Sequence, residues 1–244
     1  MKAIILAAGM SRRLEKLTEN KPKCLLEVDN KPILAYQLEA LMANGVNNIV
    51  IVVGYKGFMI KDFIKKHPIF KDWRVVFIEN DEYADSNTSY SWWLAREHIK
   101  NEQSIFHLHS DLIFFPALVR KVLEDKRKNI ICIDKKIPLN ESMEQVILDK
   151  ENKIIHMDKS NVSGAHGKAV GVAKFSNEAI IYKLGKIKSY VQLKDKNQAF
   201  YGIIREAVKD LDYYGLDIGD SFFREVNTTD EYNIALESLR NGRI

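Results

Sequence analysis

The stretch Lys2-Ala3-Ile4-Ile5-Leu6-Ala7-Ala8-Gly9-Met10-Ser11-Arg12-Arg13 decides the fold of this chain. After Lys2 it is apolar as far as Ala8, which is typical of a strand buried on both faces of a parallel sheet. The small residues that follow allow a polyanion to approach backbone N–H groups, and the two arginines add fixed positive charge. A buried strand leading into such a loop predicts an α/β protein that binds phosphate, although an ordinary first strand with solvent-facing arginines gives the same pattern.

Strand-like and helix-like runs alternate through the first half of the chain, which predicts a Rossmann-like, doubly wound α/β fold with a mixed, mainly parallel sheet. The expected strands cover residues 2–8, 48–53, 74–78, 104–109 and 129–133, with 24–28 as a short extended piece. The expected helices cover residues 33–44, 57–66, 90–95 and 116–126. A dense group of N-cap residues at 85–89 precedes the third of these helices.

The second half of the chain predicts antiparallel pairing instead. We expect a hairpin of strands at 144–148 and 153–157, then a strand at 168–175, helices at 177–184 and 197–209, a strand at 222–226 and a terminal helix capped by 228–230. The chain is therefore expected to form one domain, residues 1–244, in which residues 136–215 make a small antiparallel lid over the site.

Composition and charge describe a globular protein without a concentrated ionic surface. Hydrophobic residues make up 46% of the chain and charged residues 29%, and the net charge of +4 is a small excess. The short basic clusters at 65–66, 126–128 and 183–188 are expected to be solvated faces, so no nucleic-acid partner is predicted. The first apolar run is too short for a transmembrane helix and lacks the other parts of a secretion signal, so no membrane insertion is expected.

The two cysteines, Cys24 and Cys132, imply no disulfide framework and fit a reducing compartment. The protein is accordingly expected to be cytoplasmic. Cys24 follows Lys23 directly, which is compatible with a reactive thiol beside a cation and also with a small packed residue on a strand.

Polar clusters follow three of the expected strands, where ligands of parallel sheets bind. These clusters are Gly9 to Arg13, Ser86 to Ser89, and Ser110-Asp111. Glu225 and Asn227 lie two residues apart on the last extended segment, so their side chains share one face. Asp111 together with Glu225 offers hard oxygen ligands for Mg²⁺, whereas an isolated Asp at a strand end is commonly a cap or turn residue.

Several of these pieces together carry a family resemblance. Residues 6–14 and 22–28 resemble the paired signature of nucleoside-triphosphate-dependent nucleotidyltransferases, an L-A-A-G-x-G-x-R segment followed by P-K-x-L. The resemblance continues at 51–55, at Asn80 with Tyr83, at 87–91 and at 225–228, and it is weakest between 136 and 215. These middle and last pieces are most similar to small cytidylyltransferases of the phosphocholine cytidylyltransferase type from bacterial surface-polymer pathways. Relatives of that type act on phosphocholine, 2-aminoethylphosphonate or glutamine phosphate.

The resemblance implies a Mg²⁺-dependent transfer from CTP to a small phosphorylated or phosphonate acceptor, with release of pyrophosphate, for modification of a surface polysaccharide. It implies that Arg13, Lys23 and Asp111 are catalytic. The implied nucleotide-binding residues are Leu6, Ala7, Ala8, Gly9, Met10, Ser11, Arg12, Arg13, Lys23, Asn80, Ser86, Asn87 and Ser110. The implied metal ligands are Asp111, Glu225 and Asn227, and the residues proposed to reach the acceptor from the lid are Lys168, Tyr190 and Tyr201.

Two positions depart from the family pattern. Ser11 stands where a second glycine is usual, which a serine tolerates if its φ is negative. Asn227 stands where an Asp commonly helps to bind metal, and its amide oxygen coordinates without adding charge. These departures leave open a catalytically degenerate protein that senses or binds a nucleotide.

Three further questions of function and assembly stay open. A sugar-1-phosphate nucleotidyltransferase that uses UTP or dTTP is one possible function, although such enzymes more often end in an Asp-Ile-Gly-Thr-like segment. A dinucleotide-dependent oxidoreductase is disfavoured because the first loop holds Gly9 alone instead of Gly-x-Gly-x-x-Gly. The sequence leaves the oligomeric state open, a homodimer included.

Two aromatic or imidazole clusters have both a functional and a structural interpretation. His107, His109 and Asp111 alternate along one strand and share a face, as a transition-metal site requires, whereas packing of His107 in the core gives the same pattern. Trp92 and Trp93 form either an aromatic wall for an acceptor cation or part of the core.

Overall fold

The computed structural model describes residues 1–71 and 73–242, apart from the side chains at positions 12 and 15. Four parallel strands run from the middle of its main sheet to one edge in the order β6 (Ser104–His109), β1 (Lys2–Ala7), β4 (Asn48–Val53) and β5 (Arg74–Glu79). An antiparallel strand, β11 (Gly167–Ser176), lies on the other side of β6. The same sheet contains β8 (Ile130–Asp134), β9 (Gln145–Leu148), β10 (Ile154–Asp158) and β12 (Tyr214–Asp217). The predicted mixed α/β sheet is thus confirmed.

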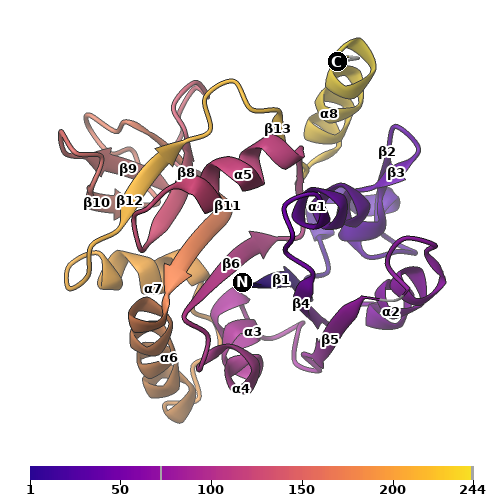
Figure 1. Cartoon of the computed structure of the whole chain (residues 1–244), viewed down its shortest axis with the longest axis horizontal. Helices are drawn as coiled ribbons and strands as arrows, with labels where there is room; N and C mark the ends of the chain where they lie inside the picture. Colours follow the sequence, from indigo (N-terminus) through magenta and orange to yellow (C-terminus); the bar gives the residue numbers. More distant parts are fainter. Residues whose placement is uncertain (72, 243–244) are drawn as a thin grey trace.

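Helices cover both faces of this sheet (Figure 1). One face packs against α1 (Ile33–Met42), α2 (Gly57–Lys66) and α5 (Pro116–Glu124), and the other against α3 (Thr88–Leu94), α4 (Arg96–Ile99), α6 (Asn177–Gln192) and α7 (Phe200–Ala207). Successive β1 residues alternate between the two cores, since Ile5 belongs to the first and Ile4 and Leu6 belong to the second. Both faces of the central strands are therefore buried, which explains their uninterrupted apolar sequences.

Two predicted elements differ from the structure. Residues 24–28 were expected to be extended, but Lys23–Leu25 is a 3₁₀ turn, η2, followed by the short strand β2 (Glu27–Val28). The turn forms because the N–H groups of Leu25 and Leu26 bond back to the carbonyls of Pro22 and Lys23, at 2.9 Å each. Helix α6 also continues to Gln192, eight residues beyond the predicted end at 184. Neither change affects the order of the elements.

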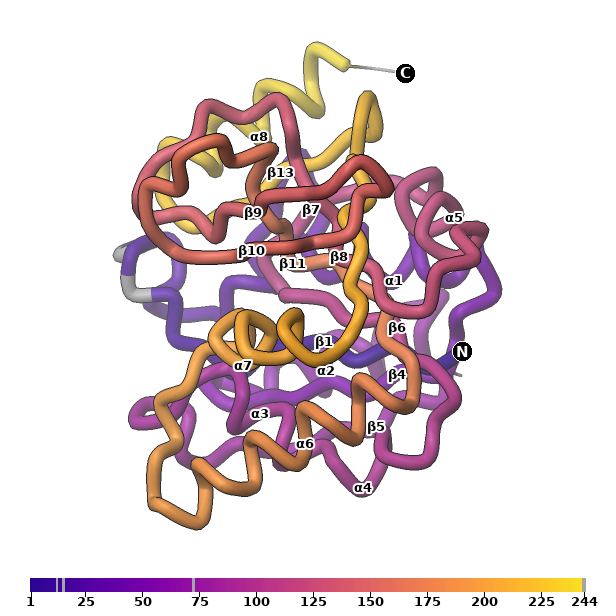
Figure 2. The backbone as a smooth tube through the Cα atoms, turned by 90° about the vertical axis from the view of Figure 1, so that its left-hand side faces the viewer, coloured from indigo at the N-terminus to yellow at the C-terminus, as the bar shows by residue number. Residues whose placement is uncertain are grey.

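Residues 136–215 contribute β9 to β12 to the main sheet, together with α6 and α7. In the main sheet, β11 lies between β6 and β8 and is antiparallel to both. Figure 2 shows the β9–β10 hairpin and α7 on the same side of the molecule. The segment is thus continuous with the sheet, and its action as a lid stays a prediction.

A third, smaller core attaches the last helix to the first loop. Strands β7 (Leu112–Phe114) and β13 (Phe223–Glu225) pair antiparallel, and β2 pairs with β3 (Lys31–Pro32). Helix α8 (Thr229–Asn241) begins with the capping box of Thr228 and Glu231. Its Ala235 packs in one cluster with Leu14, which lies on the 3₁₀ segment η1 (Arg12–Leu17). Packing of this cluster fixes the last helix to the loop that follows β1, beside the carboxyl ends of β1 and β6.

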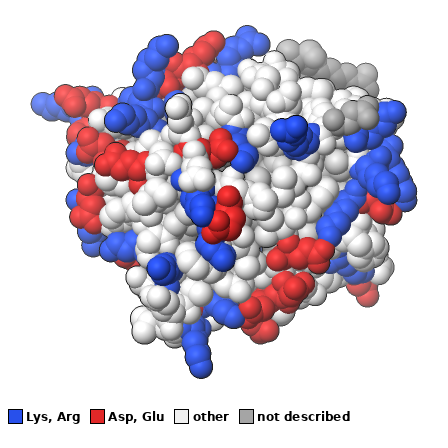
Figure 3. Space-filling view, turned by 60° about the horizontal axis from the view of Figure 1, so that its bottom comes forward, with Lys and Arg blue, Asp and Glu red and all other residues white. Residues whose placement is uncertain are grey.

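On the face shown in Figure 3, Lys and Arg side chains lie among Asp and Glu, without a broad patch of one sign over the described residues. The expected absence of a nucleic-acid partner stays a prediction. No described helix combines the length and the apolar character that spanning a membrane requires.

Lys183 contradicts the expectation that residues 183–188 form a solvated face. Its side chain is fully buried on α6, and Nζ has no hydrogen-bond partner among the described residues. Nζ lies 3.0 Å from the ring centre of Phe175 and 3.9 Å from that of Trp92, on the core side of the helix. Burial holds the pKa of Lys183 well below its usual value.

We predict that Lys183→Met raises the free energy of unfolding at pH 7 by about 2 kcal/mol, because desolvation of the ammonium exceeds its attraction to the rings. In the wild type, the native state binds this proton more weakly than the unfolded chain does, so stability rises with pH until about pH 10. The gain from methionine therefore shrinks between pH 7 and pH 9.5. Urea unfolding at both pH values measures it, and a loss of stability at pH 7 would contradict the prediction.

Candidate active site

A connected polar group lies at the carboxyl end of the central strands. Lys23 Nζ donates to Asp111 Oδ2 at 2.8 Å and to Asn227 Oδ1 at 2.9 Å. Arg13 Nη2 donates to the same Asn227 oxygen at 3.0 Å. Asn227 Nδ2 in turn donates to Glu225 Oε1 at 2.7 Å, and Lys168 forms an ion pair with the other oxygen of Glu225. Residues from five distant parts of the chain thus meet in one network.

The β7–β13 pair brings the late residues to the early ones. Asp111 comes just after β6 and just before β7, and Glu225 is the last residue of β13, opposite Leu112. The Val226 N–H donates to the Asp111 carbonyl at 2.9 Å, so the two extended segments are bonded at the site itself. Glu231 closes the arrangement by accepting from the Asn227 N–H at 2.6 Å while it caps α8.

Asp111 is held as a carboxylate in a buried place. Burial acts to raise the pKa of Asp111, but the Lys23 ammonium, His109 and a backbone hydrogen bond together outweigh it, and the pKa lies below its usual value. The second carboxylate oxygen, Oδ1, is buried and has no hydrogen-bond partner among the described residues. An anionic oxygen without a partner, on a carboxylate that pairs with Lys23 through its other oxygen, is suited to bind a divalent cation.

The loop after β1 is open and backed by β4. The Ala8 carbonyl accepts from the Tyr55 N–H at 3.0 Å, and a Cβ on Gly54 would lie 2.7 Å from that carbonyl oxygen. Leu6, Ala7 and Ala8 are buried, Gly9 and Arg13 are exposed, and Met10 is partly exposed. The Arg12 side chain lies outside the described residues. This arrangement leaves the backbone around Gly9 free to meet a ligand.

A serine in place of the usual glycine was expected to be tolerated only with a negative φ, but Ser11 has a positive φ. Its φ is +53°, a left-handed conformation in which glycine is favoured over residues with a Cβ. The conformation is stabilised locally, because the Ser11 carbonyl accepts from the Leu14 N–H at 3.0 Å and from Thr18 Oγ1 at 3.2 Å. Ser11 therefore keeps the turn geometry for which the family usually has glycine.

The remaining nucleotide-side residues form a second loop, after β5. Asn80 is buried, and its Nδ2 donates to Ser86 Oγ at 3.0 Å and to Ser91 Oγ at 3.3 Å. Asn87 is the N-cap of α3 and bonds the Thr88 N–H at 2.8 Å. Asn80 and Asn87 thus order this loop, and Ser110 lies partly exposed next to Asp111.

The three expected acceptor residues lie in different surroundings. Lys168 pairs with Glu225 and lines a cavity of about 330 Å³ with Asp134, Val170 and Phe223. Tyr201 donates to the Val170 carbonyl at 2.6 Å, so it approaches this region from α7. The Tyr190 hydroxyl instead bonds Glu206, 2.6 Å away between α6 and α7. The structure brings Lys168, but not Tyr190, to the polar network.

The histidine pair lies in the core behind Asp111. His107 Nδ1 accepts from Trp92 Nε1 at 3.1 Å, and its ring centre lies 5.1 Å from that of His109. The pKa values of both imidazoles are lowered, chiefly by burial. Among the described residues, no group of three or more His, Cys, Asp or Glu side chains is arranged to hold a metal, so a transition-metal site at these histidines has no support.

Core packing also accounts for Trp92 and Cys24. Trp92 is fully buried, which excludes it from an aromatic wall that meets a ligand, whereas Trp93 stacks with Arg96. Burial raises the pKa of the Cys24 thiol to about 12, so Cys24 is a packed thiol and not a reactive thiolate.

Comparison with known proteins assigns the family. The MobA-like NTP transferase domain matches residues 3–148, which include the first loop, Lys23 and Asp111. The chain belongs to this family. It is 28% identical over 243 residues, 99% of both chains, to choline-phosphate cytidylyltransferase of Streptococcus pneumoniae. The solved structure of CTP:phosphocholine cytidylyltransferase from that organism superimposes with a TM-score of 0.80 at 26% identity, covering 98% of each chain.

A second relative covers less of the chain. CTP:phosphoglutamine cytidylyltransferase of Campylobacter jejuni is 34% identical over 139 residues, which is 55% of this chain and 53% of the relative. Together these findings confirm the predicted resemblance. The MobA-like domain described here is a nucleotidyltransferase, and the relatives named here are cytidylyltransferases.

Gln37 of this MobA-like domain was missed by the sequence reasoning. It is fully buried on α1, and its Nε2 donates to the carbonyls of His109 and Leu112 at 2.8 and 2.9 Å. These bonds fix both ends of the turn that carries Asp111. The signal in the sequence is that Gln37 stands alone among apolar residues of a helix. A buried amide needs specific hydrogen-bond partners, so this pattern indicates a structural role.

We predict that Gly171→Ala lowers the free energy of unfolding by about 2 kcal/mol, because a Cβ there would lie 2.6 Å from the His109 ring within a packed core. His109 cannot move away without disturbing the turn at Asp111. The matched control is Gly185→Ala in the exposed middle of α6, where a Cβ meets nothing within 4 Å and helix propensity predicts a gain of about 0.5–1 kcal/mol. Equal effects of the two substitutions in urea unfolding would contradict the prediction.

Proposed function

We propose that this protein transfers CMP from CTP to a small phosphorylated or phosphonate acceptor and releases pyrophosphate. The observation that carries the proposal is the position of Lys23, whose ammonium lies between Asp111 and Asn227 beside the open loop after β1. The relatives named above support CTP and an acceptor such as phosphocholine or glutamine phosphate. We further propose that the reaction takes place in the cytoplasm and serves surface-polysaccharide modification.

The proposed reaction needs no general base. An acceptor oxygen, already anionic at neutral pH, attacks the α-phosphorus of CTP in line, and the bond from that phosphorus to the pyrophosphate oxygen breaks. The barrier arises from bringing two anions together and from charge on the transferring group. Lys23 is proposed to leave Asn227 and bridge the α-phosphate and the attacking oxygen, while Arg13 neutralises the leaving pyrophosphate.

Asn227 supports this division of roles. Its single amide oxygen accepts hydrogen bonds from both Arg13 and Lys23. The two cations are therefore held on either side of one oxygen atom before substrate binds. Neither cation is neutralised by this contact, because an amide carries no charge. Arg13 therefore keeps its charge for phosphate, whereas Lys23 is also paired with Asp111 and is proposed to exchange that contact for phosphate.

A magnesium ion fits the residues that are present. Asp111 has an unpartnered buried oxygen, and Glu225 and Asn227 add hard oxygen donors from the neighbouring segment. We propose that these three residues hold the ion, with Asn227 as a neutral ligand. When bound, Mg²⁺ supplies positive charge to the triphosphate. Lys168, which pairs with Glu225 on the proposed acceptor side of segment 136–215, is proposed to meet the acceptor phosphate.

The deciding experiment is pyrophosphate release with Mg²⁺. CTP, UTP, dTTP, ATP and GTP are each paired with phosphocholine, 2-aminoethylphosphonate, glutamine phosphate, glycerol phosphate and hexose-1-phosphates. We predict release with CTP and one of the first three acceptors. Lys23→Ala should lower that rate about 10²–10³-fold, and the exposed Lys65→Ala on α2 should leave it unchanged.

Different results of the same panel would point to a different function. Release with UTP or dTTP and a hexose-1-phosphate would replace the proposal by a sugar-1-phosphate nucleotidyltransferase. CTP binding without release for any acceptor would favour a nucleotide-sensing protein. A protein that binds no nucleotide would refute all three functions.

We predict that EDTA abolishes pyrophosphate release and that added Mg²⁺ restores it. Asp111→Asn should also reduce the shift of the thermal unfolding temperature that Mg²⁺ with CTP produces, because it removes one of two anionic ligands. Glu124→Gln, at an exposed position of α5 away from the polar network, is the control that removes one negative charge elsewhere. An equal shift in Asp111→Asn and wild type would contradict the assignment of Asp111 as a ligand.

A further inference from the structure

A second cavity lies at the opposite end of the strands of the main sheet from the polar network. It has a volume of about 430 Å³ and is lined by residues at the start of β6, at the end of β11 and in the loop that joins α5 to β8. Ser104 is the first residue of β6, whereas Asp111 follows the last. The length of the strand therefore separates this cavity from the candidate active site, and no residue lines both.

Positive charge dominates the lining of this cavity. Lys126, Arg127, Lys128 and Lys174 contribute to it, against the single carboxylate of Glu178. The Arg127 charge is already compensated, because its guanidinium makes two hydrogen bonds to Asp125 from Nε, at 3.0 and 3.1 Å, and a third from Nη2. The other three cations, Lys126, Lys128 and Lys174, form no ion pair with a residue in the described ranges 1–71 and 73–242.

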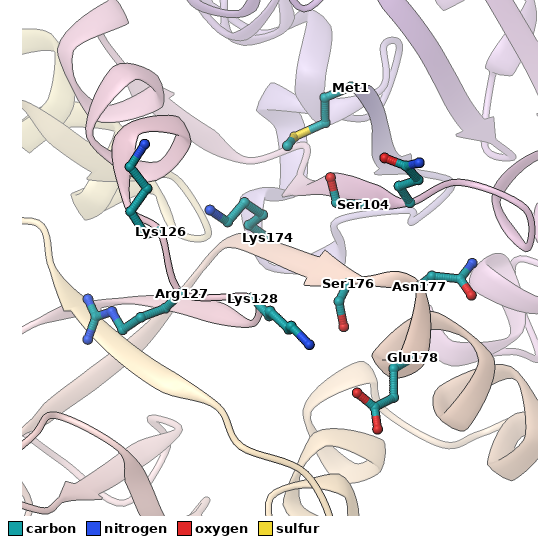
Figure 4. A pocket seen from close by; sticks show the side chains of 10 residues that line it. Met1, Ser104, Lys126, Arg127, Lys128, Lys174, Ser176, Asn177 and Glu178 are labelled. Carbon is teal, nitrogen blue, oxygen red and sulfur yellow. The ribbon is translucent and has the colours of Figure 1, made fainter.

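Lys174 is the cation that distinguishes this cavity from a solvated basic surface. It projects from β11 toward the loop of residues 126–128 (Figure 4), and only 7% of it is exposed. Its Nζ donates to the backbone carbonyl of Asp125 at 2.5 Å, which satisfies one of three N–H donors. Burial lowers the pKa of Lys174; the Asp125 carboxylate opposes this effect, and Arg127 and Lys126 add to it. A nearly buried ammonium with donors to spare is stabilised by an anion.

We propose that this cavity is a second binding site, for a small inorganic anion of the phosphate class such as phosphate or pyrophosphate. Such an anion has several acceptor oxygens, so Lys174 can bind it from the sheet side while the exposed Lys126 and Lys128 bind it from the loop. The volume is within the range of small-molecule sites. The proposal does not depend on the reaction assigned to the other end of the sheet.

Calorimetric titration with pyrophosphate in EDTA tests the site in a Lys23→Ala background, which weakens binding at the candidate active site. We expect one binding event, weakened at least about tenfold by Lys126→Glu with Lys128→Glu and also weakened by raised salt, since the attraction is between exposed charges. Lys65→Glu with Lys188→Glu is the control of equal net charge on exposed positions of α2 and α6. It should change the affinity less than twofold.

Backbone amide shifts on adding pyrophosphate locate the binding. The proposal expects the largest shifts at Gln103, Ser104 and Asn177, which line the cavity. Absence of binding, affinity unchanged by the Lys126 and Lys128 reversals, or shifts confined to the loop at Gly9 would each overturn it. These results are independent of whether CTP is the nucleotide substrate.

Discussion

The arrangement of the candidate site depends on the contact of one ammonium group, Lys23, with Asp111 and Asn227. Two carboxylates, Asp111 and Glu225, lie on paired segments at the end of a sheet, and burial opposes the ionisation of Asp111. Each is paired with a lysine, and Asn227 connects the two pairs through its amide. Without these cations the two carboxylates would repel each other, and this repulsion would destabilise the pairing of β7 with β13.

The chain around this contact is arranged to fix its position. The 3₁₀ turn after Pro22 orients Lys23, Gln37 fixes the backbone on both sides of Asp111, and the capping box of α8 fixes Asn227. The first support is a backbone turn, and the other two are side chains, of Gln37 and of the capping box, that bond backbone groups. The site is therefore largely formed before a ligand binds, which lowers the ordering cost at the moment of binding.

Local periodicity accounts for what could be predicted from the sequence. The apolar strands β1 and β4, the N-cap Asn87 and the capping residue Thr228 carry their signals within a few neighbouring residues, and all four were predicted. The signature at 6–14 and 22–28 likewise gave the family. The site roles inferred from it remain predictions, although the structure brings Arg13, Lys23, Asp111, Glu225 and Asn227 together.

The predictions that differed depend on contacts distant in the sequence or on backbone conformation. Lys183 belongs to a basic run, and only the packing of α6 on β11 shows that it is buried. The placement of β11 between β6 and β8 requires pairings across more than thirty residues, which periodicity cannot report. The positive φ of Ser11 follows from the turn that Leu14 and Thr18 close, and a serine carries no signal for it. Lys23 and Asn227, finally, touch across 204 positions of sequence. During synthesis, most strands of the sheet and the loop after β1 emerge before Asn227 does. A nascent chain that still lacks Asn227 cannot complete the polar network around Lys23. We therefore expect such a chain to be largely folded but inactive.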